Sequence, residues 1–143
     1  MRKIDFKNYP NTSTPLSAET FNLLQSNIEL TLNEYSTDET IIGTWMGKYL
    51  YRKVIEINSK DPSNTYSHGI SNVDVFVNAY GTANFTGIGE GWQPVPRVVP
   101  TNIQSYGLGV GNLKENTFTF GIGTNYGTFI KAYIILEYTK TTN

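Results

Sequence analysis

Few residues of this 143-residue chain are of the types that carry out catalysis. The single histidine, His68, could act as a general base, but no serine or cysteine nucleophile motif accompanies it. No second histidine is present to share a metal ion, so we expect His68 to make structural hydrogen bonds beside a turn. The chain has no cysteine, which excludes disulfides, zinc–thiolate sites and thiol catalysis. We predict no metal site and no cofactor.

The carboxylates could supply the acid and base of a glycoside hydrolase. Such a pair must stand about 5 to 9 Å apart, and the sequence brings no two together. The acidic residues are scattered through the chain: Asp38, Glu39, Glu56, Asp61, Asp74, Glu90, Glu115 and Glu137. Enzymes that degrade capsules are generally much longer, and no repeat typical of a β-helix is present. We therefore predict no catalytic residues, with a glycan hydrolase as the less favoured alternative.

Binding is better supported, by a proline-rich stretch. Residues 87–100, GIGEGWQPVPRVVP, are long for a hairpin loop and contain Trp92, Arg97 and three prolines. Proline limits the entropy lost on docking, and Trp92 could stack on a sugar ring or pack on its own head or a neighbouring subunit. Nearby glycine turns could bring further aromatic and amide groups to this loop. The candidate ligand-binding residues are Trp92, Arg97, Tyr106, Asn125 and Tyr126, and the ligand class that suits them is carbohydrate.

Three glycine groups, at residues 87–91, 107–111 and 121–123, superficially suggest phosphate-binding loops. None is followed by Lys-Ser/Thr or by a plausible helix, so the context that a phosphate site needs is absent. Glycine at every second position strips one face of a strand of its side chains. We expect bends at a sheet edge or tight subunit contacts there.

Composition excludes two classes of partner. The net charge is −1, and the charged fraction of 16% is below the roughly 25% of an average soluble protein. No run of lysine or arginine is present, so nucleic acid is not a predicted partner. No signal peptide is visible, and no apolar run approaches the ~18–20 residues of a membrane span. We expect synthesis in a cytoplasm and no membrane insertion.

Strand-like patterns cover most of the chain after residue 36. Residues 40–45 and 49–57 are β-prone runs around Met46-Gly47-Lys48, which predicts a hairpin with Trp45 in the core. A turn cluster follows at residues 58–64, centred on Asp61-Pro62. Later strands should each place one set of side chains on a common face: Val73, Val75, Val77 and Ala79; Phe118, Phe120 and Ile122; and Ile130, Ala132, Ile134, Leu136 and Tyr138. Short strands separated by glycine or asparagine turns favour an antiparallel sandwich or barrel.

Before these strands, the sequence predicts a helix and an arm. Ser17 is a good N-cap, and an apolar stripe follows at spacings of three and four, which predicts about five helical turns. The stripe could pack on its own sheet, or three copies could bundle around an axis; the candidate trimerisation residues are Phe21, Leu24, Ile28, Leu32 and Tyr35. Residues 1–16 have no periodicity and are either a frayed terminus or an attachment arm. The candidate anchors of that arm are Ile4, Phe6 and Tyr9.

Three segments carry a resemblance to a known family. They are STDETIIGTW with LYRKVI (residues 36–45 and 50–55), HGISNVD (68–74) and AYIILEYTKTT (132–142). In this order they resemble the fibre and receptor-binding structural proteins of bacteriophages. The resemblance implies a virion β-sandwich module, usually trimeric, and does not imply a ligand.

The predicted fold is mainly β, with a jelly-roll-like antiparallel β-sandwich head and a short N-terminal helix that forms a trimeric stalk. We divide the chain into an attachment arm (1–16), a helical stalk (17–35) and a head (36–143). The expected function is a homotrimeric virion fibre that is mounted on other virion proteins and adheres to a host-surface glycan. The alternatives are a capsid head fibre or decoration protein without a receptor role, and a lectin-like module outside any virus.

Overall fold

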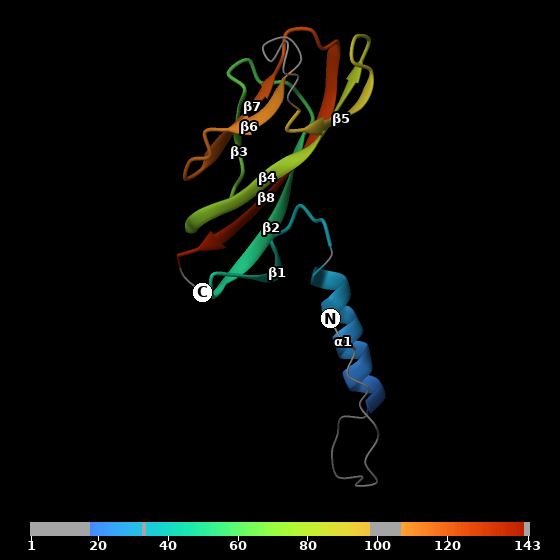
Figure 1. Ribbon diagram of the computed structural model, residues 1–143, viewed down its shortest axis with the longest axis vertical. Helices are drawn as coiled ribbons and strands as arrows, with labels where there is room; N and C mark the ends of the chain where they lie inside the picture. Colours follow the sequence, from blue (N-terminus) through green and yellow to red (C-terminus); the bar gives the residue numbers. More distant parts are fainter. Residues whose placement is uncertain (1–17, 33, 98–106, 142–143) are drawn as a thin grey trace.

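The computed structural model describes residues 18–32, 34–97 and 107–141. Within these ranges the chain is mainly β, with two antiparallel sheets and one helix (Figure 1). The larger sheet has the strand order β1-β2-β8-β4-β5, and the smaller has the order β3-β7-β6. The elements are α1 (Ala18–Leu32), β1 (Thr40–Trp45), β2 (Lys48–Ile57), β3 (Thr65–Ser67), β4 (Val73–Thr86), β5 (Gly91–Val95), β6 (Leu108–Gly111), β7 (Thr117–Ile122) and β8 (Thr128–Lys140).

The first hairpin is confirmed, with a tighter turn than expected. Lys48 pairs with Trp45, so only Met46 and Gly47 form the connection, and both have positive φ, of 48° and 80°. Two successive residues with positive φ suit the right-handed twist of the flanking strands. The prediction for Trp45 is wrong, because at the end of the hairpin it is half-buried and lies outside the hydrophobic core.

The hydrophobic core fills the space between the two sheets. On β8, alternate side chains from Ala132 to Tyr138 are fully buried, and on β7 Phe118 and Phe120 face them. The period of two along each strand produces this arrangement, as the alternation in the sequence predicted. Ile130 departs from it, with 39% of its surface exposed, while Phe129 packs on the core instead.

Two bulges in β4 overturn the predicted face of that strand. Its pairing with β8 shifts register between Val73 and Val75 and again between Phe76 and Asn78. An extra residue at a bulge reverses the in–out alternation. Phe76 therefore packs on the core, against Tyr138 and His68, whereas Val75 is exposed.

His68 has the structural role that the sequence predicted. It is 2% exposed, its Nδ1 accepts the N–H of Ile70 at 3.1 Å, and its Nε2 lies 3.0 Å from the carbonyl oxygen of Lys114. Because a carbonyl can only accept, Nε2 carries the proton and Nδ1 does not. The Nε2 contact thus ties the chain before β4 to the loop between β6 and β7, while the Nδ1 contact holds the local turn at Ile70.

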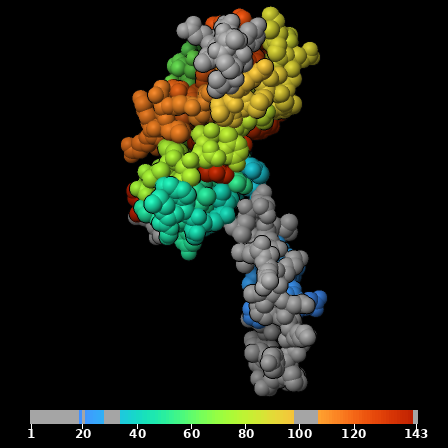
Figure 2. Space-filling view, in the orientation of Figure 1, coloured from blue at the N-terminus to red at the C-terminus, as the bar shows by residue number. Residues whose placement is uncertain are grey.

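The helix projects from the head instead of lying on a sheet. Figure 1 shows α1 extending away from the strands, with its C-terminal end near β1. In Figure 2 the blue surface of α1 lies below the head. Leu23 and Leu24 are 62% and 55% exposed. The alternative that the helix packs its apolar stripe on its own sheet therefore fails at Leu24.

The predicted helix was too long at its C-terminal end. It ends at Leu32, so Tyr35 does not continue the stripe but contacts the head. Ile28 and Leu32 lie in α1, but the structure does not describe their side chains. Ser17 and the predicted anchors Ile4, Phe6 and Tyr9 lie outside the described residues. The trimeric stalk and the jelly-roll likeness stay predictions.

The linker between α1 and β1 is fastened to the sheet by Glu39. The hydroxyl of Tyr138, whose residue is fully buried, donates a hydrogen bond to Glu39 Oε2, and Lys140 Nζ lies 2.5 Å from Glu39 Oε1. Nearby, the N–H of Val54 donates to the carbonyl of Ser36 at 2.8 Å. Burial, then the hydrogen bond to Glu39, raises the pKa of Tyr138 above the ordinary 10.0.

We expect the protein to lose stability in alkali through Tyr138. Unfolded tyrosine ionises near pH 10.0, whereas in the folded chain Tyr138 holds its proton to higher pH. The unfolded state therefore releases the proton first, and the stabilisation, complete below this pH, is lost as the pH rises above it. Denaturant titrations across this range should show a shallower fall for Tyr138→Phe than for the wild type. Equal slopes would contradict the assignment.

Candidate binding face

One face of the five-stranded sheet points away from the core and carries a regular array of polar and aromatic side chains. On β8, the residues between the buried positions point outward, and strand pairing places their partners on the same face. We call this the outer face; it comprises Arg52, Val54 and Glu56 of β2, Tyr80, Thr82 and Asn84 of β4, Trp92 and Pro94 of β5, and Lys131, Tyr133, Ile135 and Glu137 of β8.

Trp92 and Tyr133 form a stacked aromatic pair at one end of the outer face. Their ring centroids are 5.9 Å apart and their planes differ by 21°, so the two rings, which come from the strands on either side of β4, lie nearly parallel and offset. Trp92 is nevertheless 49% exposed. Stacked rings with one side open to solvent suit the apolar face of a sugar ring. We call this pair the aromatic platform.

Beside the aromatic platform, the sheet aligns an amide and a cation with Trp92. Asn84 pairs with Trp92 on one side and with Lys131 on the other, so one row crosses three strands. The ammonium of Lys131 lies 3.1 Å from the Tyr133 hydroxyl and 5.3 Å from the centre of its ring. The hydrogen bond to Tyr133 raises the pKa of Lys131, with a smaller contribution from the charge of Glu56. Lys131 is therefore a fixed positive charge at neutral pH.

The opposite end of the outer face is closed by its own contacts. Arg52 donates to Glu137 Oε1 from Nε at 3.0 Å and from a terminal nitrogen at 2.8 Å, and each side chain is only 13% exposed. The Tyr80 hydroxyl also donates to Glu137, at 3.1 Å. The Arg52 guanidinium lies 4.3 Å from the centre of the Tyr35 ring. This end joins the linker to the head and leaves little free for a ligand.

Of the predicted ligand-binding residues that the structure describes, only Trp92 lies on the outer face. The stretch 87–100 is not one long loop, because β5 lies within it and Trp92 is in the middle of that strand. A strand holds Trp92 more rigidly than a loop would. Tyr106 lies outside the described residues, and Asn125 is an exposed turn residue between β7 and β8.

Arg97 and Tyr126 do come together, but for packing. An Arg97 guanidinium nitrogen donates to the Tyr126 hydroxyl at 3.3 Å and to the side-chain carbonyl of Gln93. The Tyr126 ring stacks on buried Phe85, with centroids 4.5 Å apart, and presses against the turn at Gly89. A Cβ added at Gly89 would lie 2.8 Å from the Tyr126 ring. Arg97 and Tyr126 therefore serve to pack this end of the fold.

Three residues of this site were not predicted: Tyr133, Lys131 and Asn84. Tyr133 and Lys131 occupy the positions between the buried residues of β8. The signal that could have identified this site in the sequence was an aromatic residue at a solvent-facing position of the strand. Asn84 could not be assigned to a face, because the bulges in β4 are not visible in the sequence.

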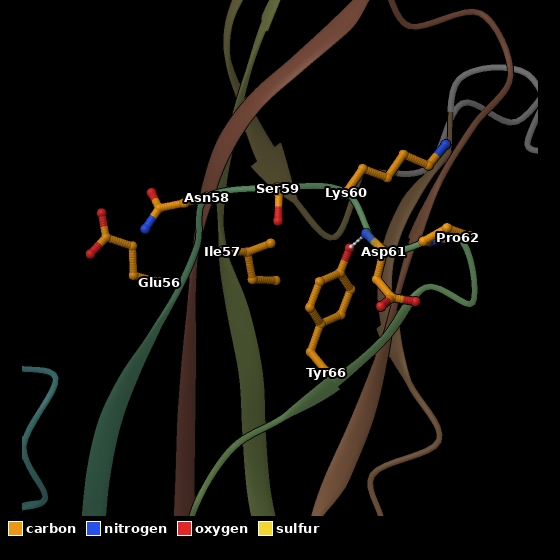
Figure 3. A pocket seen from close by; sticks show the side chains of 8 residues that line it. All are labelled: Glu56, Ile57, Asn58, Ser59, Lys60, Asp61, Pro62 and Tyr66. Atoms are coloured by element: carbon orange, nitrogen blue, oxygen red, sulfur yellow. Dashed lines mark hydrogen bonds between the residues drawn. The ribbon is translucent and has the colours of Figure 1, made fainter.

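A shallow depression of about 450 Å³ lies at the turn between β2 and β3 (Figure 3). Its lining is Glu56, Ile57, Asn58, Ser59, Lys60, Asp61, Pro62 and Tyr66. The Tyr66 hydroxyl accepts the N–H of Asp61 at 2.9 Å, and the Asp61 carboxylate accepts the N–H of Ser63 at 2.7 Å. Hydrogen bonds from Ser63 hold the pKa of Asp61 below its usual value. The polar groups of Asp61, Ser63 and Tyr66 thus form hydrogen bonds within the turn itself, as expected for an Asp-Pro turn cluster.

In the described ranges, no three histidine or carboxylate side chains gather as metal ligands. No helix there is both long and apolar enough to cross a membrane. Comparisons of the chain with protein-family models, with curated proteins and with solved structures found no match.

Proposed function

We propose that the chain is a bacteriophage virion fibre protein, a homotrimer mounted by residues 1–16, whose head adheres to carbohydrate on the host surface. The proposal draws on the resemblance within residues 36–142, on the two-sheet head and on the helix that projects from it. Adhesion without catalysis agrees with the only histidine being buried and hydrogen-bonded on both ring nitrogens.

The aromatic platform is the observation that carries the adhesive function. Trp92 and Tyr133 come from β5 and β8, and the backbone of β4 between them is hydrogen-bonded to both strands. A ligand that stacks there therefore does not have to order a loop, which lowers the entropic cost of binding. An exposed indole next to an amide and an ammonium fits the apolar faces and hydroxyl groups of a sugar.

Trimerisation would compensate for a shallow site of low intrinsic affinity. Three heads on one stalk make the second and third contacts intramolecular, which raises the effective affinity without new contacts in each site. The exposed Leu24 belongs to the helix stripe that a bundle would cover.

Replacing Trp92 with alanine should weaken binding to host-surface polysaccharide by about tenfold or more, because the stacking surface is lost. The measurement is a pull-down or titration against a panel of host polysaccharides. Tyr49→Ala is the matched control, since Tyr49 is 48% exposed but lies on the first hairpin. If the intact trimer binds no polysaccharide in the panel, adhesion is excluded and a decoration role is favoured.

Light scattering coupled to size-exclusion chromatography should give the mass of three chains. Leu24→Glu should reduce the mass to that of one chain while the far-ultraviolet spectrum of the head is kept, because charges would meet at the bundle axis. Leu23→Glu is the control, since Leu23 is also exposed but lies off the predicted stripe. A wild-type chain that stays monomeric at micromolar concentration contradicts the stalk.

A further inference from the structure

The charges of the outer face are unevenly available to a ligand. Arg52 and Glu137 neutralise each other at 2.8 Å and are largely buried. Lys131 makes no ion pair within 4.0 Å in the part of the chain that the structure describes. Its hydrogen bond to the Tyr133 hydroxyl uses one of the three donors of an ammonium group. Lys131 is therefore the cation of this face that can turn donors toward a ligand.

The position of Lys131 relative to Trp92 matters more than its charge alone. The row Trp92–Asn84–Lys131 crosses β5, β4 and β8, and neighbouring strands are about 4.8 Å apart. A sugar ring stacked on the aromatic platform thus has the Lys131 ammonium at its edge. Glu56, the carboxylate whose charge acts on Lys131, pairs with Tyr133 from β2, one strand further from Trp92. The arrangement favours a negative group on the ring or on its neighbour.

We infer that the outer face recognises an anionic saccharide, which stacks one ring on Trp92 and Tyr133 and places its negative group against the Lys131 ammonium. This inference rests on the proposed adhesive function and narrows it to one ligand class. A uronic acid carboxylate and a sugar phosphate share the required chemistry. Asn84 is placed to contact hydroxyl groups between the ring and the charge.

The test uses the full chain and a matched pair of probes, a galacturonate hexamer and its fully methyl-esterified form, titrated by calorimetry at low salt. The acid form should bind about tenfold more tightly than the ester, because one charge-assisted hydrogen bond is removed by esterification. Lys131→Gln should remove the difference between the two affinities, because the acid form loses its contact with the ammonium. Lys114→Gln, at an exposed lysine on the other side of the head, should keep the preference. Added salt should shrink the preference in the wild type.

Two results separate this inference from the proposed function. Equal affinity for acid and ester, or a preference that survives in Lys131→Gln, overturns the anionic specificity while adhesion stands. Failure to bind both hexamers and every member of the polysaccharide panel overturns adhesion itself. Galactose 6-phosphate compared with galactose, in the wild type and in Lys131→Gln, tells whether phosphate serves as well as carboxylate.

Discussion

Replacing Gly81 with alanine is expected to lower the free energy of unfolding by more than about 4 kcal/mol, which places it among the exceptional single substitutions. Gly81 lies in β4 between Val95 of β5 and Ile134 of β8. A Cβ at this position would stand 2.0 Å from the carbonyl oxygen of Tyr133 and 3.1 Å from the Cα of Ile134. Because both atoms belong to the backbone of the central strand, relief requires the two strands to separate.

Gly109→Ala is the matched control for this substitution. Gly109 also lies in a strand, its φ is not in the left-handed region, and a Cβ there meets nothing within 4 Å. Alanine should leave stability unchanged or raise it by about 0.4–1 kcal/mol, because the unfolded chain loses conformational freedom. Urea titrations and the yield of soluble protein measure both variants. Equal stability of the two variants would mean that β4 and β8 approach less closely than described.

Phe120→Ala should lower the free energy of unfolding by about 3–5 kcal/mol, the usual cost of a fully buried aromatic side chain. Phe120 is 0% exposed and is surrounded by aromatic rings, with centroid distances of 6.3 Å to Phe129 and 6.5 Å to Tyr66. These neighbours belong to both sheets, so the cavity would open between the two layers. Rigid rings fill such a cavity poorly.

The control for Phe120 is Ile88→Ala, at a side chain that is 66% exposed in the turn before β5. Its effect should remain within about 0.5 kcal/mol of zero. Urea denaturation gives both values from midpoints, provided that the slopes agree. A loss below about 1 kcal/mol for Phe120→Ala would show that the sheets do not pack through this ring.

The parts of the fold that follow from local periodicity were predictable. The alternation from Ala132 to Tyr138, the pair Phe118 and Phe120, and the glycine turn after Met46 each appear in consecutive residues. The bulges around Val75 and Phe76 were not predictable, because a bulge depends on which strand lies alongside and shifts the phase without a local signal. The helix end was misplaced for a related reason: Tyr35 fits a helical stripe, but the contact with Arg52 makes it part of the head.

The candidate site was predictable only at Trp92. The exposure and aromatic character of Trp92 are properties of one residue. The aromatic platform also needs Tyr133, which is 41 residues later in the sequence and two strands away in the sheet. The grouping of Arg97 with Tyr126 was anticipated, but their proximity serves the packing around Phe85. Proximity to a glycine turn therefore identified neighbours without identifying their role.

The way the linker is fastened decides how the head would respond to mechanical load. A pull transmitted along α1 reaches the contacts of Tyr35, Ser36 and Glu39 before it reaches β1. Those contacts attach to β2 and β8, the second and third strands of the sheet, so tension bypasses the edge strand and enters the middle of the larger layer. The edge strand β1 is thereby protected from being peeled away one hydrogen bond at a time.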